Sequence, residues 1–84
     1  MKSTVFRAIL KSKGYSSSQI MALSHFGYES ALDAHEDMRE ALEQENINFA
    51  RYCLDIGRDF VIDNLDSLTF DDNGNVTWAK ETEQ

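Results

Sequence analysis

The chain has 84 residues, 42% of them hydrophobic, and a single cysteine. This length allows one small domain, 1–84, with a thin core, since such a chain buries only about 60–65% of the surface that its unfolded form exposes. Fifteen acidic against eight basic residues give a net charge of −7, which disfavours direct binding of DNA or RNA. The lone cysteine cannot form an internal disulfide, no apolar run exceeds a few residues, and charges interrupt any signal-peptide core near the N-terminus. The sequence therefore predicts a cytoplasmic protein with no membrane segment.

Charge is divided unevenly along the chain. Residues 1–28 carry four basic side chains and no acid, whereas residues 29–84 carry all 15 acids against four basic side chains, so the net charges are +4 and −11. Such asymmetry indicates either ion pairing within the chain or a charged docking surface. The basic residues of the first part are Lys2, Arg7, Lys11 and Lys13.

Apolar spacing and the absence of proline predict a mainly α fold, a compact bundle of about four helices followed by a β-hairpin. The first helix has Ser3 or Thr4 as a fitting N-cap, and Gly14 suits the left-handed position after its last turn. The serines at 16–18 offer caps for the second helix, which we expect to stop at Gly27. The expected helices span residues 4–13, 17–26, 30–45 and 47–66.

The fourth expected helix is strongly two-sided and is predicted to be the centre of the core. It also contains Gly57, and a glycine inside a helix costs about 1 kcal/mol relative to alanine. A close helix crossing is the commoner cause of such a glycine and is our prediction here, and a hinge is the alternative. The apolar stripe consists of Phe49, Ala50, Cys53, Leu54, Phe60, Val61 and Leu65.

The alternating pattern after residue 67 predicts a β-hairpin with strands near 68–70 and 76–78. A two-residue turn would divide its apolar side chains between two faces. A three-residue loop with Gly74 in the left-handed conformation collects them on one face, and we predict this register. That face must then pack on the helices or on another chain. The predicted pairs are Leu68 with Trp78 and Phe70 with Val76.

Motifs for catalysis or metal binding are weak. Aligning Gly74 with the sixth position of a calcium-binding EF-hand loop puts Thr69 and Lys80 where carboxylates are needed. The two histidines and the cysteine lack the spacing of a zinc site. No nucleophile elbow, phosphate-binding loop or dinucleotide fingerprint occurs. We therefore expect no enzymatic activity, no metal and no cofactor.

Charge also disfavours a DNA-reading helix-turn-helix. Its turn would fall at residues 26–28, and the next helix would then present carboxylates to the phosphates of the duplex. The basic side chains lie in the first helix instead. A small nucleic-acid-binding regulator that uses this helix stays as an alternative.

The acidic surface is the feature that points to a function. Five carboxylates on the third expected helix span about 15 Å of rise, about half the charge density of a DNA duplex. Such a surface can attract a basic, nucleic-acid-handling protein, with Ile62 and Trp78 as apolar anchors. The competing explanation is a solvated face that confers solubility. The predicted partner-binding acids are Asp33, Glu36, Asp37, Glu40, Glu43, Asp55, Asp59, Asp63 and Asp66.

These observations predict a non-enzymatic acidic interaction protein, a nucleic-acid mimic that binds and inhibits or modulates a basic partner protein. In size and charge, though in no motif, it is similar to the small immunity and antitoxin proteins that neutralise nucleases. Besides the nucleic-acid regulator, the alternative is a self-associating module, for example a homodimer in which the basic first helix pairs with a neighbour's acidic helix.

Overall fold

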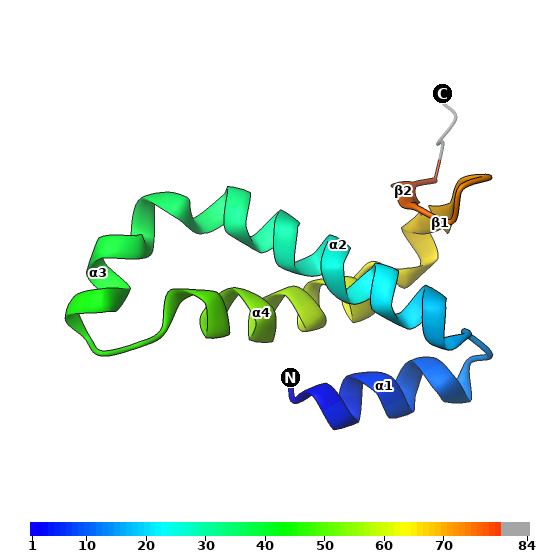
Figure 1. The fold of residues 1–84 in the computed structure, drawn as a ribbon, viewed down its shortest axis with the longest axis horizontal. Coiled ribbons are helices and arrows are strands. Elements are labelled where there is room, and N and C mark those ends of the chain that lie inside the picture. The colour runs from blue at the N-terminus through cyan, green and yellow to red at the C-terminus, as the bar shows by residue number, and fades with distance from the viewer. Residues whose placement is uncertain (80–84) are drawn as a thin grey trace.

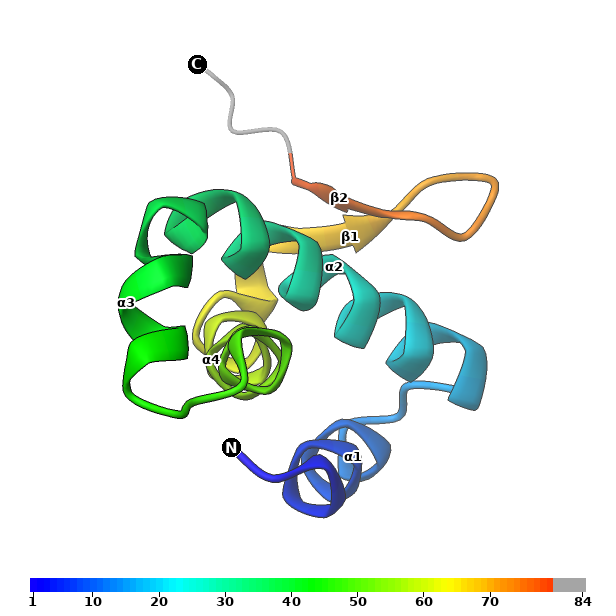
Figure 2. The same ribbon diagram turned by 60° about the vertical axis from the view of Figure 1, so that its left-hand side comes forward.

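The structure, a computed structural model, describes residues 1–79 and is mainly helical, with an antiparallel two-stranded hairpin (Figure 1). The long helices α2 and α4 pack against each other, and α1 and the hairpin lie on opposite sides of this pair (Figure 2). None of the described helices has the length and apolar character needed to cross a bilayer. The elements are α1 (Ser3–Ser12), α2 (Ser17–His35), the 3₁₀ turn η1 (Glu36–Met38), α3 (Arg39–Gln44), α4 (Phe49–Asp63), the 3₁₀ turn η2 (Leu65–Ser67), β1 (Leu68–Phe70) and β2 (Val76–Trp78).

Helix α1 ends as the sequence predicts. Gly14 adopts a left-handed conformation with φ 96°, and the amide of Tyr15 donates to the carbonyl oxygen of Leu10 at 3.1 Å. This pattern satisfies carbonyls at the end of a helix that would otherwise lack partners. The predicted N-cap is wrong, because Lys2 occupies that position and its side chain makes no capping hydrogen bond.

Helix α2 is continuous where the sequence predicted two helices. The expected stop at Gly27 is wrong, because this glycine lies inside the helix. The start of α2 is fixed by a capping box: the Ser16 hydroxyl accepts from the Gln19 amide at 3.2 Å, and the Gln19 side chain accepts from the Ser16 amide at 2.9 Å. A turn at residues 26–28, which a helix-turn-helix would need, is therefore absent from the fold.

The third expected helix, 30–45, is interrupted. The backbone leaves the helical conformation at His35, with φ −121°, and η1 separates α2 from the six-residue α3. Asn46 then ends α3 in the left-handed conformation, with φ 62°, while the Ile47 amide donates to the Leu42 carbonyl oxygen at 2.9 Å. The predicted bundle of about four helices is not confirmed: the described chain forms three helices of at least ten residues and the short α3.

Two glycines face each other where α2 crosses α4. A Cβ atom on Gly27 would lie 2.4 Å from the carbonyl oxygen of Gly57, and one on Gly57 would lie 2.5 Å from the carbonyl oxygen of Gly27. Neither separation is sterically tolerable, so the backbones approach this closely only because both side chains are missing. The close crossing predicted at Gly57 is confirmed.

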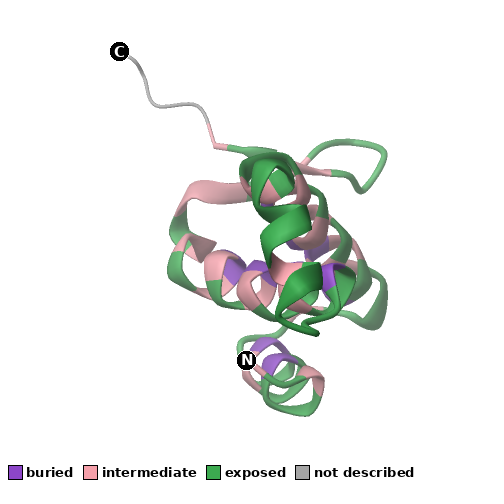
Figure 3. Cartoon of the chain, turned by 90° about the vertical axis from the view of Figure 1, so that its left-hand side faces the viewer, coloured by how far each residue is buried: buried purple, intermediate pink, exposed green. Residues whose placement is uncertain are grey.

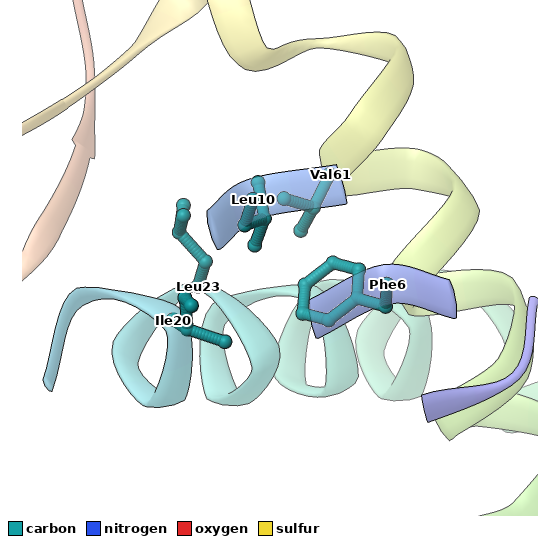
Figure 4. Close-up of a cluster of buried hydrophobic side chains, with 5 residues drawn as sticks. All are labelled: Phe6, Leu10, Ile20, Leu23 and Val61. Atoms are coloured by element: carbon teal, nitrogen blue, oxygen red, sulfur yellow. The ribbon is translucent and has the colours of Figure 1, made fainter. Parts of the chain in front are cut away.

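The core is divided into two clusters that lie on either side of this crossing. In Figure 3 the buried positions fall on the helices, while the hairpin is exposed or half-buried. The first cluster, which joins α1, α2 and α4, consists of Phe6, Leu10, Ile20, Leu23 and Val61 (Figure 4). The second, between α2 and α4, consists of Ala31, Phe49 and Cys53.

The apolar stripe predicted on α4 is only partly buried. Ala50 is exposed, and Leu54, 36% exposed, borders a groove between α1 and α2. The helix also ends at Asp63 rather than at residue 66, because Asn64 leaves the helical conformation. The Asn64 side-chain amide donates to the carbonyl oxygen of Phe60 at 2.8 Å and so satisfies one of the last carbonyls.

The hairpin has the predicted register, with Leu68 opposite Trp78. Its loop is stabilised by Asp71, whose carboxylate accepts from the amides of Asn73 and Asn75, each at 2.9 Å. Gly74 is left-handed, with φ 85°. The loop thereby holds both strands in one pairing and puts their shared apolar face against the helices.

Candidate functional site

Four predicted partner-binding carboxylates lie where α2 passes into α3, and we call them the acidic end. Asp33 belongs to the last turn of α2, Glu36 and Asp37 lie in η1, and Glu40 lies in the first turn of α3. All four are exposed, and none makes an ion pair with another described residue. Their charge is therefore uncompensated within residues 1–79.

Glu43, the next predicted acid, has a partner. Its carboxylate accepts from Nε of Arg39 at 3.4 Å, one helical turn away. The Arg39 guanidinium also lies 5.5 Å from the centre of the Phe49 ring, a cation–π contact. Glu43 therefore contributes less net charge to this surface than the four residues of the acidic end.

The first two acids of α4 surround the amino group of Met1. Asp55 forms an ion pair and a hydrogen bond with this amino group, and a carboxylate oxygen of Asp59 lies 3.4 Å from it. The Arg58 guanidinium donates to the Met1 carbonyl oxygen at 3.0 Å. The hydrogen bond raises the pKa of the amino group and lowers that of Asp55. Counting charged side chains alone missed this amino group, although it is a cation at neutral pH.

The nine predicted acids are therefore not gathered into one cluster. Asp63 and Asp66 are exposed at the end of α4 and in η2, without an ion pair to another described residue. Four acids form the acidic end, two hold the amino group of Met1, and one pairs with Arg39.

The two predicted apolar anchors have different surroundings. Ile62 is half-buried and packs against the first core cluster, as Met1 does. Trp78 is 50% exposed at the end of β2. Of the two predicted anchors, Trp78 is thus the one that presents a large apolar surface to solvent.

Trp78 is held in place by neighbouring rings and by the backbone. Its ring packs edge-to-face against Phe26, with centroids 5.8 Å apart, and against Phe60, with centroids 5.7 Å apart. The amide of Ala79, the next residue, donates to the carbonyl oxygen of Ser67 at 2.7 Å. The exposed half of the indole is therefore presented by a fixed strand, as a preorganised contact requires.

A cleft of about 460 Å³ separates α2 from α4 beside Trp78, and we call it the Trp78 cleft. Asp33 lines the same cleft, so a carboxylate of the acidic end and the exposed indole border one space although they are distant in the sequence. Sequence reasoning named both residues but carried no signal that they meet. The lining residues are Ser30, Ala31, Asp33, Ala34, His35, Ile56, Phe60 and Trp78.

The cleft contains a serine, an aspartate and a histidine, but they are not arranged for nucleophilic catalysis. Among the described hydrogen bonds, none joins Ser30, Asp33 and His35 to one another; Nδ1 of His35 lies 3.3 Å from the sulfur of Met38. A metal site is not formed either, because within residues 1–79 no three ligating side chains converge on one point. The chemistry that this cleft offers is apolar contact beside a negative charge.

A second surface, a groove between α1 and α2, was not predicted from the sequence. Two adjoining hollows of about 330 and 400 Å³ share Arg7, Ile20 and Met21, and Lys11 lines the second. Met21 is 71% exposed. This side of the molecule therefore combines basic side chains with an apolar surface.

Comparison with known proteins assigns this chain to no family. No protein-family model, no curated protein and no solved structure matches this chain. The charge and the exposed apolar surface of the described residues are therefore the features that indicate a function.

Proposed function

We propose that this protein is a non-enzymatic interaction protein whose acidic end binds a basic partner protein and thereby inhibits or modulates it. The observation that carries the proposal is the acidic end itself: four exposed carboxylates without an ion-pair partner among the described residues, one of which borders the Trp78 cleft. Charge steers the approach of the partner, and the exposed apolar surface then slows its dissociation.

The physical basis is electrostatic. The chain has a net charge of −7, and like charges at the acidic end repel one another until a basic surface neutralises them. Proteins that handle nucleic acid have such surfaces, because they bind phosphates with lysine and arginine. An inhibitor of this kind would occupy the phosphate-binding surface of its partner.

The test compares two double variants of equal charge. Asp37→Asn/Glu40→Gln removes two charges from the acidic end. Asp66→Asn/Asp72→Asn removes a predicted acid that lies outside the acidic end and an acid of the hairpin loop, so both double variants change the net charge from −7 to −5. Affinity for a short lysine- and arginine-rich peptide is measured by calorimetry at low and at high salt. We expect the first variant to bind about fivefold more weakly and the second to bind almost normally. Equal loss in both variants, or no binding at low salt, would contradict the proposal.

One observation favours a self-associating module as a second candidate. The groove between α1 and α2 carries Arg7, Lys11 and the exposed Met21, and is complementary in charge to the acidic end of another copy. Such a contact would join unlike surfaces of two copies. Sedimentation at low and high salt tests it: a dimer that dissociates with salt and with Met21→Ser supports it, and a monomer at all concentrations excludes it.

The nucleic-acid alternative uses the same basic side chains. Arg7 and Lys11 lie on α1 and line this groove, where phosphates could contact them. A gel shift with duplex DNA at low ionic strength is the test, because phosphate binding is strongest there. No shift under these conditions would exclude this candidate.

A further inference from the structure

We infer that the Trp78 cleft is the docking site for a basic amphipathic segment of the partner, which inserts apolar side chains against Trp78 and places a lysine or arginine on Asp33. This inference rests on the proposed function and specifies the kind of segment that the partner presents. The cleft, about 460 Å³, is large enough for one or two side chains rather than for a whole helix.

The apolar part of the cleft is exposed, but its position is fixed. Trp78 remains 50% exposed although Leu68, Phe70 and Val76, the other apolar residues of the hairpin, pack against the first core cluster. Fixing an exposed indole on a paired strand lowers the conformational entropy that binding would otherwise cost. Tryptophan is also among the residues that contribute most energy at protein interfaces.

Charge at the cleft selects a cationic segment. Asp33 has no ion pair with another described residue, and it is continuous in the chain with the remaining carboxylates of the acidic end, which begin at Glu36. A purely apolar segment would leave this charge partly desolvated and unpaired, which is unfavourable. A segment with apolar residues on one side and basic residues on the other satisfies both walls of the cleft.

Two peptides separate this inference from general charge attraction. One is a basic amphipathic peptide, and the other has the same basic residues but serine at each apolar position. Trp78 is the only tryptophan of the chain, so its fluorescence reports occupancy of the cleft directly. We expect the amphipathic peptide to bind about tenfold more tightly and to shift the emission of Trp78 to shorter wavelength. Equal affinity of the two peptides, or unchanged emission, would overturn the inference.

Variants that leave the hairpin intact complete the test. Ala34→Gln places a longer polar side chain into the cleft from the exposed side of α2 at unchanged charge, and Ala41→Gln makes the same change on α3 as a control. Ala34→Gln and Asp33→Asn are each expected to weaken the amphipathic peptide about fivefold, and Ala41→Gln is expected to have no effect. Loss of affinity with Ala41→Gln as large as with Ala34→Gln would contradict the docking site.

The outcomes distinguish the inference from the function on which it rests. If both peptides bind with equal affinity and salt sensitivity, the acidic end binds basic proteins but the cleft does not dock a segment. If neither peptide binds at low salt, the proposed function fails as well. If the cleft is instead covered by a second copy of the chain, the emission of Trp78 changes with protein concentration in the absence of peptide, and the inference is wrong.

Discussion

The carbonyl oxygen of Gly57 occupies the position that a side chain on Gly27 would need, and the carbonyl oxygen of Gly27 does the same for Gly57. The two helices that carry these residues make by far the most extensive contact in the fold. Any added carbon must therefore push α2 and α4 apart and loosen the two core clusters on either side. The crossing is consequently the position at which the fold is most sensitive to a small change.

Gly27→Ala and Gly57→Ala are each expected to lower the free energy of unfolding by about 1–3 kcal/mol, the usual cost of forcing extra carbon into a packed interior. The direction of the change in stability identifies the close crossing, because a glycine-to-alanine exchange at an unobstructed helix position stabilises a protein by about 1 kcal/mol. Urea denaturation measures both variants. Thr4→Ala, at an exposed position of α1, is the control and should change stability little. A stabilised Gly57→Ala protein would refute the close crossing.

Stability is expected to depend on pH through the amino group of Met1 and Asp55. The pKa of the amino group is raised from its ordinary value of 8.0. Its contribution to the stability of the fold is therefore complete below pH 8.0 and is lost as the pH rises through the pKa of the folded state. The pKa of Asp55 is lowered from its ordinary value of 3.8. Its contribution to the stability of the fold is therefore complete above pH 3.8 and is lost as the pH falls through the pKa of the folded state. The pair thus stabilises the fold between these limits.

Because the Asp55 side chain is 57% exposed, we expect the ion pair to contribute only about 0.2–1 kcal/mol. Denaturation midpoints across the pH range for the unmodified protein and for Asp55→Asn should differ within that window and converge above and below it. Acetylation of the amino group should reproduce the loss at neutral pH, because it removes the terminal charge. Asp66→Asn, which removes an acid without a described ion pair, should leave the profile unchanged; the same change in both variants would argue against a specific pair.

The hairpin shows where sequence reasoning was sufficient. Alternation has a period of two, so a shift by one residue would have moved Trp78 and Val76 to the face opposite Phe70, and the apolar pattern allows one register only. The close crossing at Gly57 was predictable for a similar reason, since a glycine that costs helix stability within an apolar stripe needs a packing cause.

Gly27 shows where sequence reasoning was insufficient. A glycine that follows an apolar helical segment has the same local sequence whether it ends the helix or faces another helix, and only the tertiary contact with Gly57 decides between the two. The candidate site had the same limitation. Asp33 and Trp78 border one cleft because the hairpin packs beside α2, and no local pattern in either segment encodes that meeting.

The loop of the hairpin should control the order of the Trp78 cleft. Asp71→Ala removes a carboxylate that accepts two backbone amides, from Asn73 and Asn75, and this loss should loosen the pairing of the two strands. Amide hydrogen exchange of β1 and β2 is expected to accelerate about tenfold, while exchange at the centre of α4 stays unchanged. Asp72→Ala, in the same loop but without a described hydrogen bond from its side chain, serves as the control. Equal acceleration in both variants would mean that the carboxylate of Asp71 does not order the loop.

Cys53 provides a chemical probe of the same architecture. Its side chain lies in the second core cluster with 0% exposure, and burial raises the pKa of its thiol. Since the thiolate is the reactive form, a soluble disulfide reagent should modify the native protein only when the chain opens. The rate of Cys53 labelling should therefore be proportional to the equilibrium population of open molecules. Gly27→Ala destabilises the crossing beside this cluster and should accelerate the labelling. Rapid labelling of the native protein at a rate indifferent to Gly27→Ala would show that α2 does not cover Cys53 in solution, and the packing of the second cluster would then be wrong.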